Sequence, residues 1–513
     1  MGWNQIFTPT TTLNTRAAFT TAPWILRPEK PFSTEELTQL GWSTAPRFGQ
    51  VVMEIEGMGP SGIPGDPFSL TIQDQIQLSQ DFSWLKGNHQ LKFGWLGLRQ
   101  FWGGNNPFQF TFFGPDQTSD PTQSGGVLSG IGLASAVLGL PAEFDGLFEQ
   151  FGHRWYTWSF YGQDEWKITP KLTLNFGLRY EFEAPTKYFK PAPSTFDLRT
   201  GDFLLGGGQL PPPCSSTGVA PCIPGDGTLA SIPGGEHIRL ADRPNIRVPD
   251  RNNFAPRLGL AWQLVPRTVL RAGAGVTYDV FAGINQQSNN IQGRWPGVAF
   301  FGRELNDLGE PLTPVETVVV GRNDPLPDDF PWFDTAVNFD PRKKTPYSVQ
   351  YHLEFQHEFT ANLLASLAYV GSVNRRTDRS YAINTALTPG PGTAEQVDQR
   401  RPFPYMPYAA YGYGTDSGRG SYNALQLHLN RRFAGGTMLL VNYTWSKTID
   451  NGSSGWFGAE NGPAGDSATQ NPFDVRSNRS VAAYDVPHNF WVSAIWELPF
   501  GKGKSWLLVA SIG

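Results

Sequence analysis

The sequence has little charge, two cysteines and no long apolar run. Charged residues make up 17% of the 513 residues, against roughly 25% in an ordinary soluble protein. The net charge of −5 excludes a strongly basic nucleic-acid-binding protein, so we expect no nucleic-acid partner. Mean hydropathy is −0.33, and no stretch resembles a transmembrane helix, which needs about 20 apolar residues. Aromatic residues, at 13%, are too frequent for a disordered chain.

The longest apolar segment, residues 127–140, is interrupted by serines and glycines. It is too short to cross a bilayer, and we expect a small buried or interfacial helix there. The N-terminal residues 1–4 lack the basic region of a secretory signal, and threonines follow where its apolar core would be. Taken alone, these features would indicate a cytosolic protein.

The hydrophobic pattern, however, has a period of two. Between Thr71 and Trp84 the even positions are mainly apolar and end in Phe82 and Trp84, whereas the odd positions are all polar. Such alternation predicts a β-strand, because successive side chains of a strand point to opposite faces. The pattern recurs along the chain and predicts about thirteen or fourteen strands, most of them longer than the usual five or six residues.

The connections between these strands alternate in length. Tight turns such as residues 86–89 and 169–171 alternate with long segments rich in Gly, Pro, Asn and Asp. The long segments lie near residues 20–48, 102–154, 184–254, 280–346, 373–421 and 448–488. Short turns at one end and long loops at the other are typical of an outer-membrane β-barrel. The fold class is therefore all-β, a transmembrane antiparallel barrel with short periplasmic turns and long extracellular loops. A soluble β-protein is the weaker alternative, because its strands would be shorter.

In such a barrel one face of each strand lines the lumen and the other contacts outer-membrane lipid. The pattern assigns these polar residues to the lumen: Gln73, Gln75, Gln77, Asp81, Glu165, Lys167, Arg179, Glu181, Arg271, Gln350, His352, Glu354 and His428. Each could contact a solute, but a wide barrel needs a polar wall in any case. The pattern assigns these residues to the lipid face and its aromatic girdles: Phe82, Trp84, Phe93, Trp95, Trp166, Phe176, Tyr180, Trp262, Tyr351, Phe355, Tyr443 and Trp445.

Five segments carry a family resemblance. Residues 160–181 (FYGQDEWKITPKLTLNFGLRYE) resemble the central hairpin of TonB-dependent outer-membrane receptors, and more specifically of their Oar-like branch. Residues 253–259, 369–372, 442–447 and 497–503 resemble the same branch in the same order. The resemblance implies localisation in the outer membrane of a Gram-negative bacterium.

The family pattern also includes a signal peptide, a carboxypeptidase-regulatory-like domain, a coupling motif and a plug, none of which is recognised in this chain. Family barrels have about 22 strands, so about eight are missing from the pattern. We therefore expect the whole of residues 1–513 to be one partial receptor-like barrel domain, lacking also the last strands.

No motif indicates catalysis, a metal or a cofactor. Asp164 and Glu165 are adjacent in a strand and should face opposite ways, and the seven histidines show no zinc-binding spacing. Gly273 and Gly275 lie within a strand and should relieve crowding on its inner face. We expect a protein that is not an enzyme and holds no cofactor.

The two cysteines, Cys214 and Cys222, lie in the long loop near residues 184–254. In an extracytoplasmic loop a disulfide is favoured over two free thiols.

The resemblance implies a full-length parent that takes up a scarce solute, using a TonB-like energy-coupling protein as its partner. A surface binding or adhesion scaffold and a passive porin-like barrel remain alternatives. Siderophores, oligosaccharides, peptides and cobalamin all fit the class, and loop composition does not choose among them.

Overall fold

The computed structural model describes most of the chain. The described residues are 1–26, 35, 39, 51–56, 58–63, 69–105, 108–120, 129–148, 150–190, 192–213, 223, 226–232, 234–280, 299–304, 338–381, 383–390, 392–405, 413–452 and 474–500. Their helices are all short: η1 (Asp116–Thr118), α2 (Gly132–Val137), η2 (Leu229–Ser231), η3 (Gly235–His237) and α5 (Ala394–Asp398). Among the described residues, none of the helices has the length and apolar character to cross a membrane.

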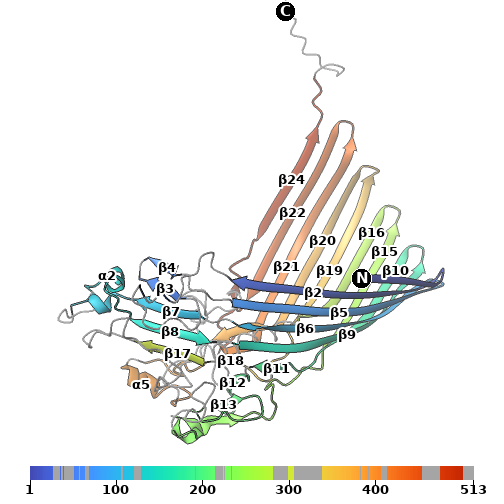
Figure 1. Ribbon diagram of the computed structural model, residues 1–513. Coiled ribbons are helices and arrows are strands. Elements are labelled where there is room, and N and C mark those ends of the chain that lie inside the picture. Colours follow the sequence, from blue (N-terminus) through green and yellow to red (C-terminus); the bar gives the residue numbers. More distant parts are fainter. Residues whose placement is uncertain are drawn as a thin grey trace, which may run out of the picture.

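One 16-stranded sheet, here called the long sheet, dominates the fold (Figure 1). Its main strands pair antiparallel in chain order: β1 (Gly2–Thr8), β2 (Thr11–Leu26), β5 (Ser69–Lys86), β6 (His89–Asn105), β9 (Gln150–Thr169), β10 (Leu172–Glu183), β15 (Phe254–Val265), β16 (Thr268–Tyr278), β19 (Tyr347–Thr360), β20 (Leu363–Tyr381), β21 (Tyr413–Ala434) and β22 (Thr437–Asp450). Both β23 (Ser480–Val481) and β24 (His488–Trp496) then pair antiparallel with β22. Two short strands, β11 (Lys187–Lys190) and β18 (Asn338–Phe339), pair with β9 and β21. The all-β class is confirmed.

The strands form where the alternating pattern predicts them, and tight turns join them in pairs. At the β5–β6 turn Gly87 has φ +58°, a backbone conformation that glycine adopts without steric cost. The β15–β16 turn places Arg267 at φ +67°, and the β21–β22 turn uses Gly435 and Gly436. Strands that are consecutive in the sheet and joined by tight turns form an up-and-down topology, which is the topology of outer-membrane barrels.

The long sheet is strongly curved but is not closed on itself within the described residues. In Figure 1 the strands β2, β5, β6 and β9 lie in front, and the strands β10, β15, β16, β19, β20, β21, β22 and β24 rise behind them. Among the described strands, β1 pairs only with β2, and β24 pairs only with β22. Within the described residues the sheet is therefore open, with β1 at one edge and β23 and β24 at the other.

Several strands extend beyond the expected ones. β2 continues to Leu26, β6 to Asn105 and β20 to Tyr381, all within segments expected as loops. Apolar and polar residues alternate only where one face of a strand meets lipid and the other meets water. Backbone hydrogen bonds between strands do not depend on this alternation, so the strands can extend beyond it.

The segments expected as loops also form two small sheets. A 5-stranded sheet combines β17 (Ala299–Glu304), β8 (Glu143–Phe148), β7 (Phe108–Phe113), β3 (Val51–Ile55) and β4 (Gly59–Ile63). The expected helix within residues 127–140 is present as α2 and lies beside β7 and β3 (Figure 1). It is only partly buried, since Val137 is 78% exposed.

The second small sheet has a hydrophobic core of its own. It consists of β12 (Ser194–Asp197), β13 (Asp202–Leu205) and β14 (Ile238–Leu240). These strands and the buried residues packed on them are here called the β12–β14 unit. Its core combines residues distant in sequence: Phe196, Phe203, Leu205, Ile223, Ile232, Ile238, Ile383 and Tyr413. Loop segments thus fold together into a compact structure beside the rim of the long sheet.

Candidate functional site

The strand register places all thirteen residues assigned to the lumen on one face of the long sheet, here called the polar face. Directly opposite residues of antiparallel strands share a face. Gln75 is opposite Gln100, Glu165 is opposite Asn175, and Arg271 is opposite Glu354, with the same register continuing from strand to strand. The thirteen residues are Gln73, Gln75, Gln77, Asp81, Glu165, Lys167, Arg179, Glu181, Arg271, Gln350, His352, Glu354 and His428.

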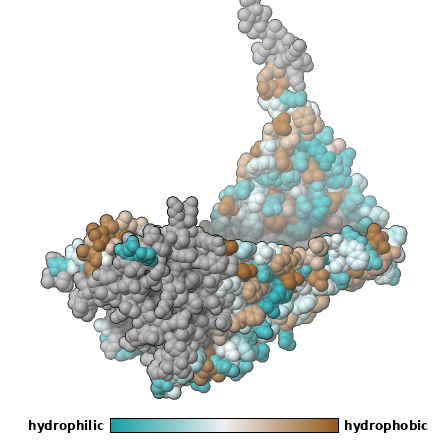
Figure 2. All heavy atoms as spheres, viewed as in Figure 1, coloured by the Kyte–Doolittle hydropathy of each residue, from teal (hydrophilic) through white to brown (hydrophobic). Residues whose placement is uncertain are grey.

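The opposite face, here called the apolar face, carries all twelve residues assigned to lipid and its girdles. These are Phe82, Trp84, Phe93, Trp95, Trp166, Phe176, Tyr180, Trp262, Tyr351, Phe355, Tyr443 and Trp445. Their neighbours include Leu258 and Leu178, which are 58% and 50% exposed. Figure 2 shows both hydrophobic and hydrophilic residues on the visible surface of the sheet.

Asp164 and Glu165 point to opposite faces, as predicted. Glu165 lies on the polar face between Gln90 and Asn175. Asp164 lies on the apolar face, where its Oδ2 is 2.7 Å from Nδ1 of His89. Paired carboxylate chemistry is thereby excluded for these two residues, because they cannot reach one substrate.

Polar groups on the polar face bind one another across strands. The Tyr161 hydroxyl donates to Asp81 Oδ1 at 2.6 Å, although the residues are 80 positions apart. Gly94 lies between them, and a Cβ there would come within 2.5 Å of the Tyr161 ring. Arg179 of β10 lies directly opposite Tyr161, and its Nε donates to Oε1 of Glu181, two residues further along β10, at 2.5 Å. Two of the predicted carboxylates are therefore already engaged by neighbouring side chains.

Glycines also make room for larger side chains further along this face. A Cβ on Gly273 would lie 2.5 Å from the His352 ring, as the sequence prediction of relieved crowding requires. At Gly275 the nearest atom, Cγ of Arg257, would be at an ordinary 3.4 Å. Crowding is therefore relieved at Gly273 in particular.

Two concave pockets adjoin on the polar face. A pocket of about 290 Å³ is lined by Lys92, Tyr161, Gln163, Arg179 and Arg257, among others. A second pocket of about 630 Å³ shares Arg257 and is lined mainly by polar-face residues of β15, β16, β19 and β20, together with Tyr422 of β21. Sequence reasoning did not select Lys92, Tyr161, Gln163 or Arg257. The alternating pattern could have found two of them. Lys92 lies between the apolar residues Leu91 and Phe93, and Arg257 precedes the apolar Leu258, so both alternate with lipid-facing positions.

Buried ion pairs join the rim of the long sheet to the segments that follow it. Arg247 Nη1 lies 2.5 Å from Glu183 Oε1, and both side chains are less than 10% exposed. Lys343 forms a second pair with Asp378. Burial lowers the pKa of Lys343, and the attraction of Asp378 only partly opposes that effect. These pairs hold loop segments in one arrangement, because separating either partner would leave a buried charge alone.

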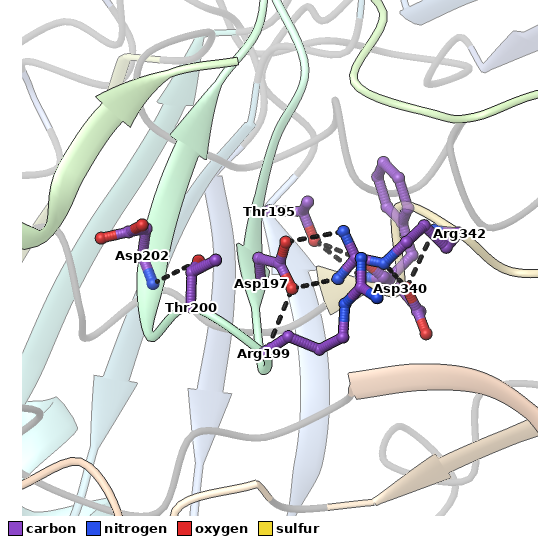
Figure 3. A network of polar contacts seen from close by, with 8 residues as sticks. Thr195, Asp197, Arg199, Thr200, Asp202, Asp340 and Arg342 are labelled. Atoms are coloured by element: carbon purple, nitrogen blue, oxygen red, sulfur yellow. Dashed lines mark hydrogen bonds and ion pairs between the residues drawn. The ribbon is translucent and has the colours of Figure 1, made fainter. Parts of the chain in front are cut away.

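A polar network fixes the β12–β14 unit to the segment that contains β18 (Figure 3). Thr195 Oγ1 donates to the Phe339 carbonyl and accepts from its N–H, each at 2.8 Å. Asp197 accepts hydrogen bonds from the Arg342 guanidinium and from the backbone N–H of Arg199. Burial alone would raise the pKa of Asp197, but these hydrogen bonds outweigh it and hold the pKa below its ordinary value. Since β18 also pairs with β21, the network connects the unit to the long sheet.

Cys214 and Cys222 lie outside the described residues. Their described neighbours Pro213 and Ile223 form a β-bridge, and Ile223 N–H donates to the Pro212 carbonyl at 2.8 Å. The disulfide stays a prediction. So does the absence of a cofactor, although no group of three or more potential metal ligands occurs within the described ranges.

A curved antiparallel sheet with one polar and one apolar face is the wall of a membrane barrel. The model of the family described as outer membrane beta barrel domain matches residues 1–512, so the chain belongs to this family. The protein is accordingly an outer-membrane β-barrel protein, and its location is the outer membrane of a Gram-negative bacterium. A comparison with curated proteins gives no match.

Solved structures similar to the chain include three outer-membrane proteins. The outer membrane transporter YddB from Escherichia coli is 10% identical with a TM-score of 0.44, over 88% of this chain and 41% of that one. The pyoverdine receptor FpvA from Pseudomonas aeruginosa is 10% identical with a TM-score of 0.39, over 88% and 43%. The ferric-catecholate import receptor Fiu from E. coli is 11% identical with a TM-score of 0.38, over 96% and 50%. The chain spans half or less of the length of these proteins.

Proposed function

We propose that the chain forms barrel wall and extracellular loops of an energy-coupled solute-uptake receptor of the TonB-dependent, Oar-like type. The observation that carries the proposal is the polar face, whose pockets adjoin near Arg257 on a sheet of barrel curvature. The five sequence segments that resemble the Oar-like branch support the same assignment. In this proposal the polar face lines the lumen, the apolar face contacts lipid, and a TonB-like protein supplies energy to the full-length receptor.

Folded loops further support uptake. A loop that only connected two strands would need no hydrophobic core, whereas the β12–β14 unit buries Phe196 and Leu205 completely. Buried ion pairs at the rim keep such loops in a defined arrangement. A preformed loop structure suits solute capture at the mouth of a barrel.

The test is uptake by cells that express the complete gene from which this chain comes. Cells would be supplied with radiolabelled ferric siderophore, cobalamin, oligosaccharide or peptide, each assayed with and without the energy-coupling complex. The proposal expects accumulation of at least one solute, lost when the coupling complex is deleted.

The two alternatives give different results in the same assay. A passive porin would admit solutes equally well without the coupling complex. A binding or adhesion scaffold would retain ligand at the cell surface with no accumulation inside. Either result would contradict energy-coupled uptake.

A further inference from the structure

A single row of directly paired residues crosses the polar face. Lys92 of β6 is opposite Gln163 of β9, which is opposite Gly177 of β10. Gly177 is opposite Arg257 of β15, and the row continues through Gly275 and Gln350. Neighbouring strands lie about 4.8 Å apart, so the Cα atoms of Lys92 and Arg257 are roughly 14 Å apart across three strand spacings.

The pockets along this row contain positive charge and no carboxylate. The charged side chains that line the smaller pocket are Lys92, Arg179 and Arg257. The larger pocket shares Arg257 and likewise has no Asp or Glu in its lining. The chain as a whole carries a net charge of −5, so this concentration of cations does not follow from composition.

Two of these cations have no ion-pair partner in the part of the chain that the structure describes. Arg179 binds Glu181, but no carboxylate lies within ion-pair distance of Lys92 or Arg257 among those residues. Asp81 is one row away and already accepts the Tyr161 hydroxyl. Arg257 is exposed, and its row neighbours Gly177 and Gly275 have no side chain to cover it.

We propose that this cationic row is a binding site for a small anionic solute that carries carboxylate or phosphate groups. The planar guanidinium of Arg257 can donate two parallel hydrogen bonds to either group, and Lys92 contributes a second charge from the other end of the pocket. The side-chain amides of Gln163 and Gln350 can donate to further oxygens of the same solute. The inference rests on the proposed uptake function and names the class of its solute.

Calorimetric titration of the full chain, refolded in detergent with its β-signal checked by circular dichroism, tests the site. The probes are citrate and inorganic phosphate, with maltose as the neutral control. We expect citrate or phosphate to bind and maltose not to bind. The tighter of the two anions would identify carboxylate or phosphate as the preferred group.

Substitutions locate the site on the row. R257Q should weaken anion binding by about tenfold or more, since it removes a charged hydrogen-bonding group, and K92Q should weaken it as well. The matched control is R432Q, because Arg432 is exposed on β21 about 33 Å along the strand from the level of Tyr422. The R432Q variant should bind the anion as tightly as the unchanged chain.

Absence of anion binding to the folded chain would overturn the site, as would equal binding by R257Q. The titration involves no cells and no energy source. A negative titration with intact energy-coupled uptake would therefore reject the site alone, whereas binding without uptake would reject the proposed function alone.

Discussion

The long sheet and the β12–β14 unit are stabilised in different ways. In the long sheet, large apolar side chains such as Leu258 and Trp445 are 58% exposed, and paired backbone groups connect each strand to the next. In the β12–β14 unit, Phe196 and Leu205 are 0% exposed within a packed core. The first needs lipid to cover its apolar face, whereas the second is built like a small soluble domain. One chain therefore contains two regions that should respond differently to the same kind of substitution.

The largest expected effect is on the core of the β12–β14 unit. Phe196→Ala removes a ring that packs against Phe403 at a centroid distance of 4.7 Å, and it should destabilise the unit by about 3–5 kcal/mol. Limited proteolysis should then cleave within residues 192–250, while the β-signal of the long sheet is retained. The control Phe176→Ala, whose side chain is 44% exposed on the apolar face, should leave proteolysis of the unit unchanged. Equal proteolysis of both variants would contradict the comparison.

A charge on the apolar face should come next in size. Leu258→Arg should cost about 2–4 kcal/mol when the chain folds into lipid vesicles, because the guanidinium would face hydrocarbon. Asn175→Arg, on the polar face of the adjacent strand, should change the free energy of folding by less than about 0.5 kcal/mol. Urea titration in vesicles measures both. If the two variants lost equal stability, the assignment of faces to lipid and lumen would be wrong.

The predicted disulfide between Cys214 and Cys222 should have a smaller effect. Closing a loop this short should stabilise the loop region by about 2–3 kcal/mol relative to a Cys214→Ser, Cys222→Ser double variant. Thiol labelling of the denatured chain should be negative before reduction and positive after it. Labelling before reduction would show two free thiols.

The smallest expected effect is a pH dependence confined to the β12–β14 unit. The folded-state pKa of Asp197 lies below its ordinary value of 3.8, so its stabilisation is complete above that value. The stabilisation is lost as the pH falls through the lowered pKa, because the unfolded chain then binds the proton more readily. Asp197→Asn should cost about 1–2 kcal/mol near neutral pH and remove this dependence. The measurement is the rate of proteolysis of the β12–β14 unit between pH 2 and 7, in the unchanged chain and in Asp197→Asn. If both showed the same dependence on pH, the role of Asp197 would be contradicted.

Much of the long sheet was predictable from sequence, and less of the candidate site. The period-two pattern between Thr71 and Trp84 predicts both the strand and the two faces on which its side chains lie, because alternation is a property of the single strand. The anion-site residues Lys92 and Arg257 obey the same alternation. Nothing local indicates that they share one row, because the register between β10 and β15 spans a connection of about seventy residues.

The β12–β14 unit was not predictable from the pattern. Its strands are four residues or shorter. Its core combines Phe196 and Ile238, from the connection between β10 and β15, with Ile383 and Tyr413, which lie after β20 and at the start of β21. Strands this short show no periodicity, and Gly- and Pro-rich flanks resemble ordinary loop sequence.

The sequence by itself determined the class of the protein and the two faces of its barrel strands, because low charge, modest hydropathy and period-two alternation all follow from strands that meet lipid on one side and water on the other. Only the tertiary structure decided which polar residues are neighbours. The Tyr161–Asp81 hydrogen bond, the row from Lys92 to Gln350 and the core around Phe196 join residues far apart along the chain. Such contacts depend on strand register and on packing between distant segments, and neither is a local property of the chain.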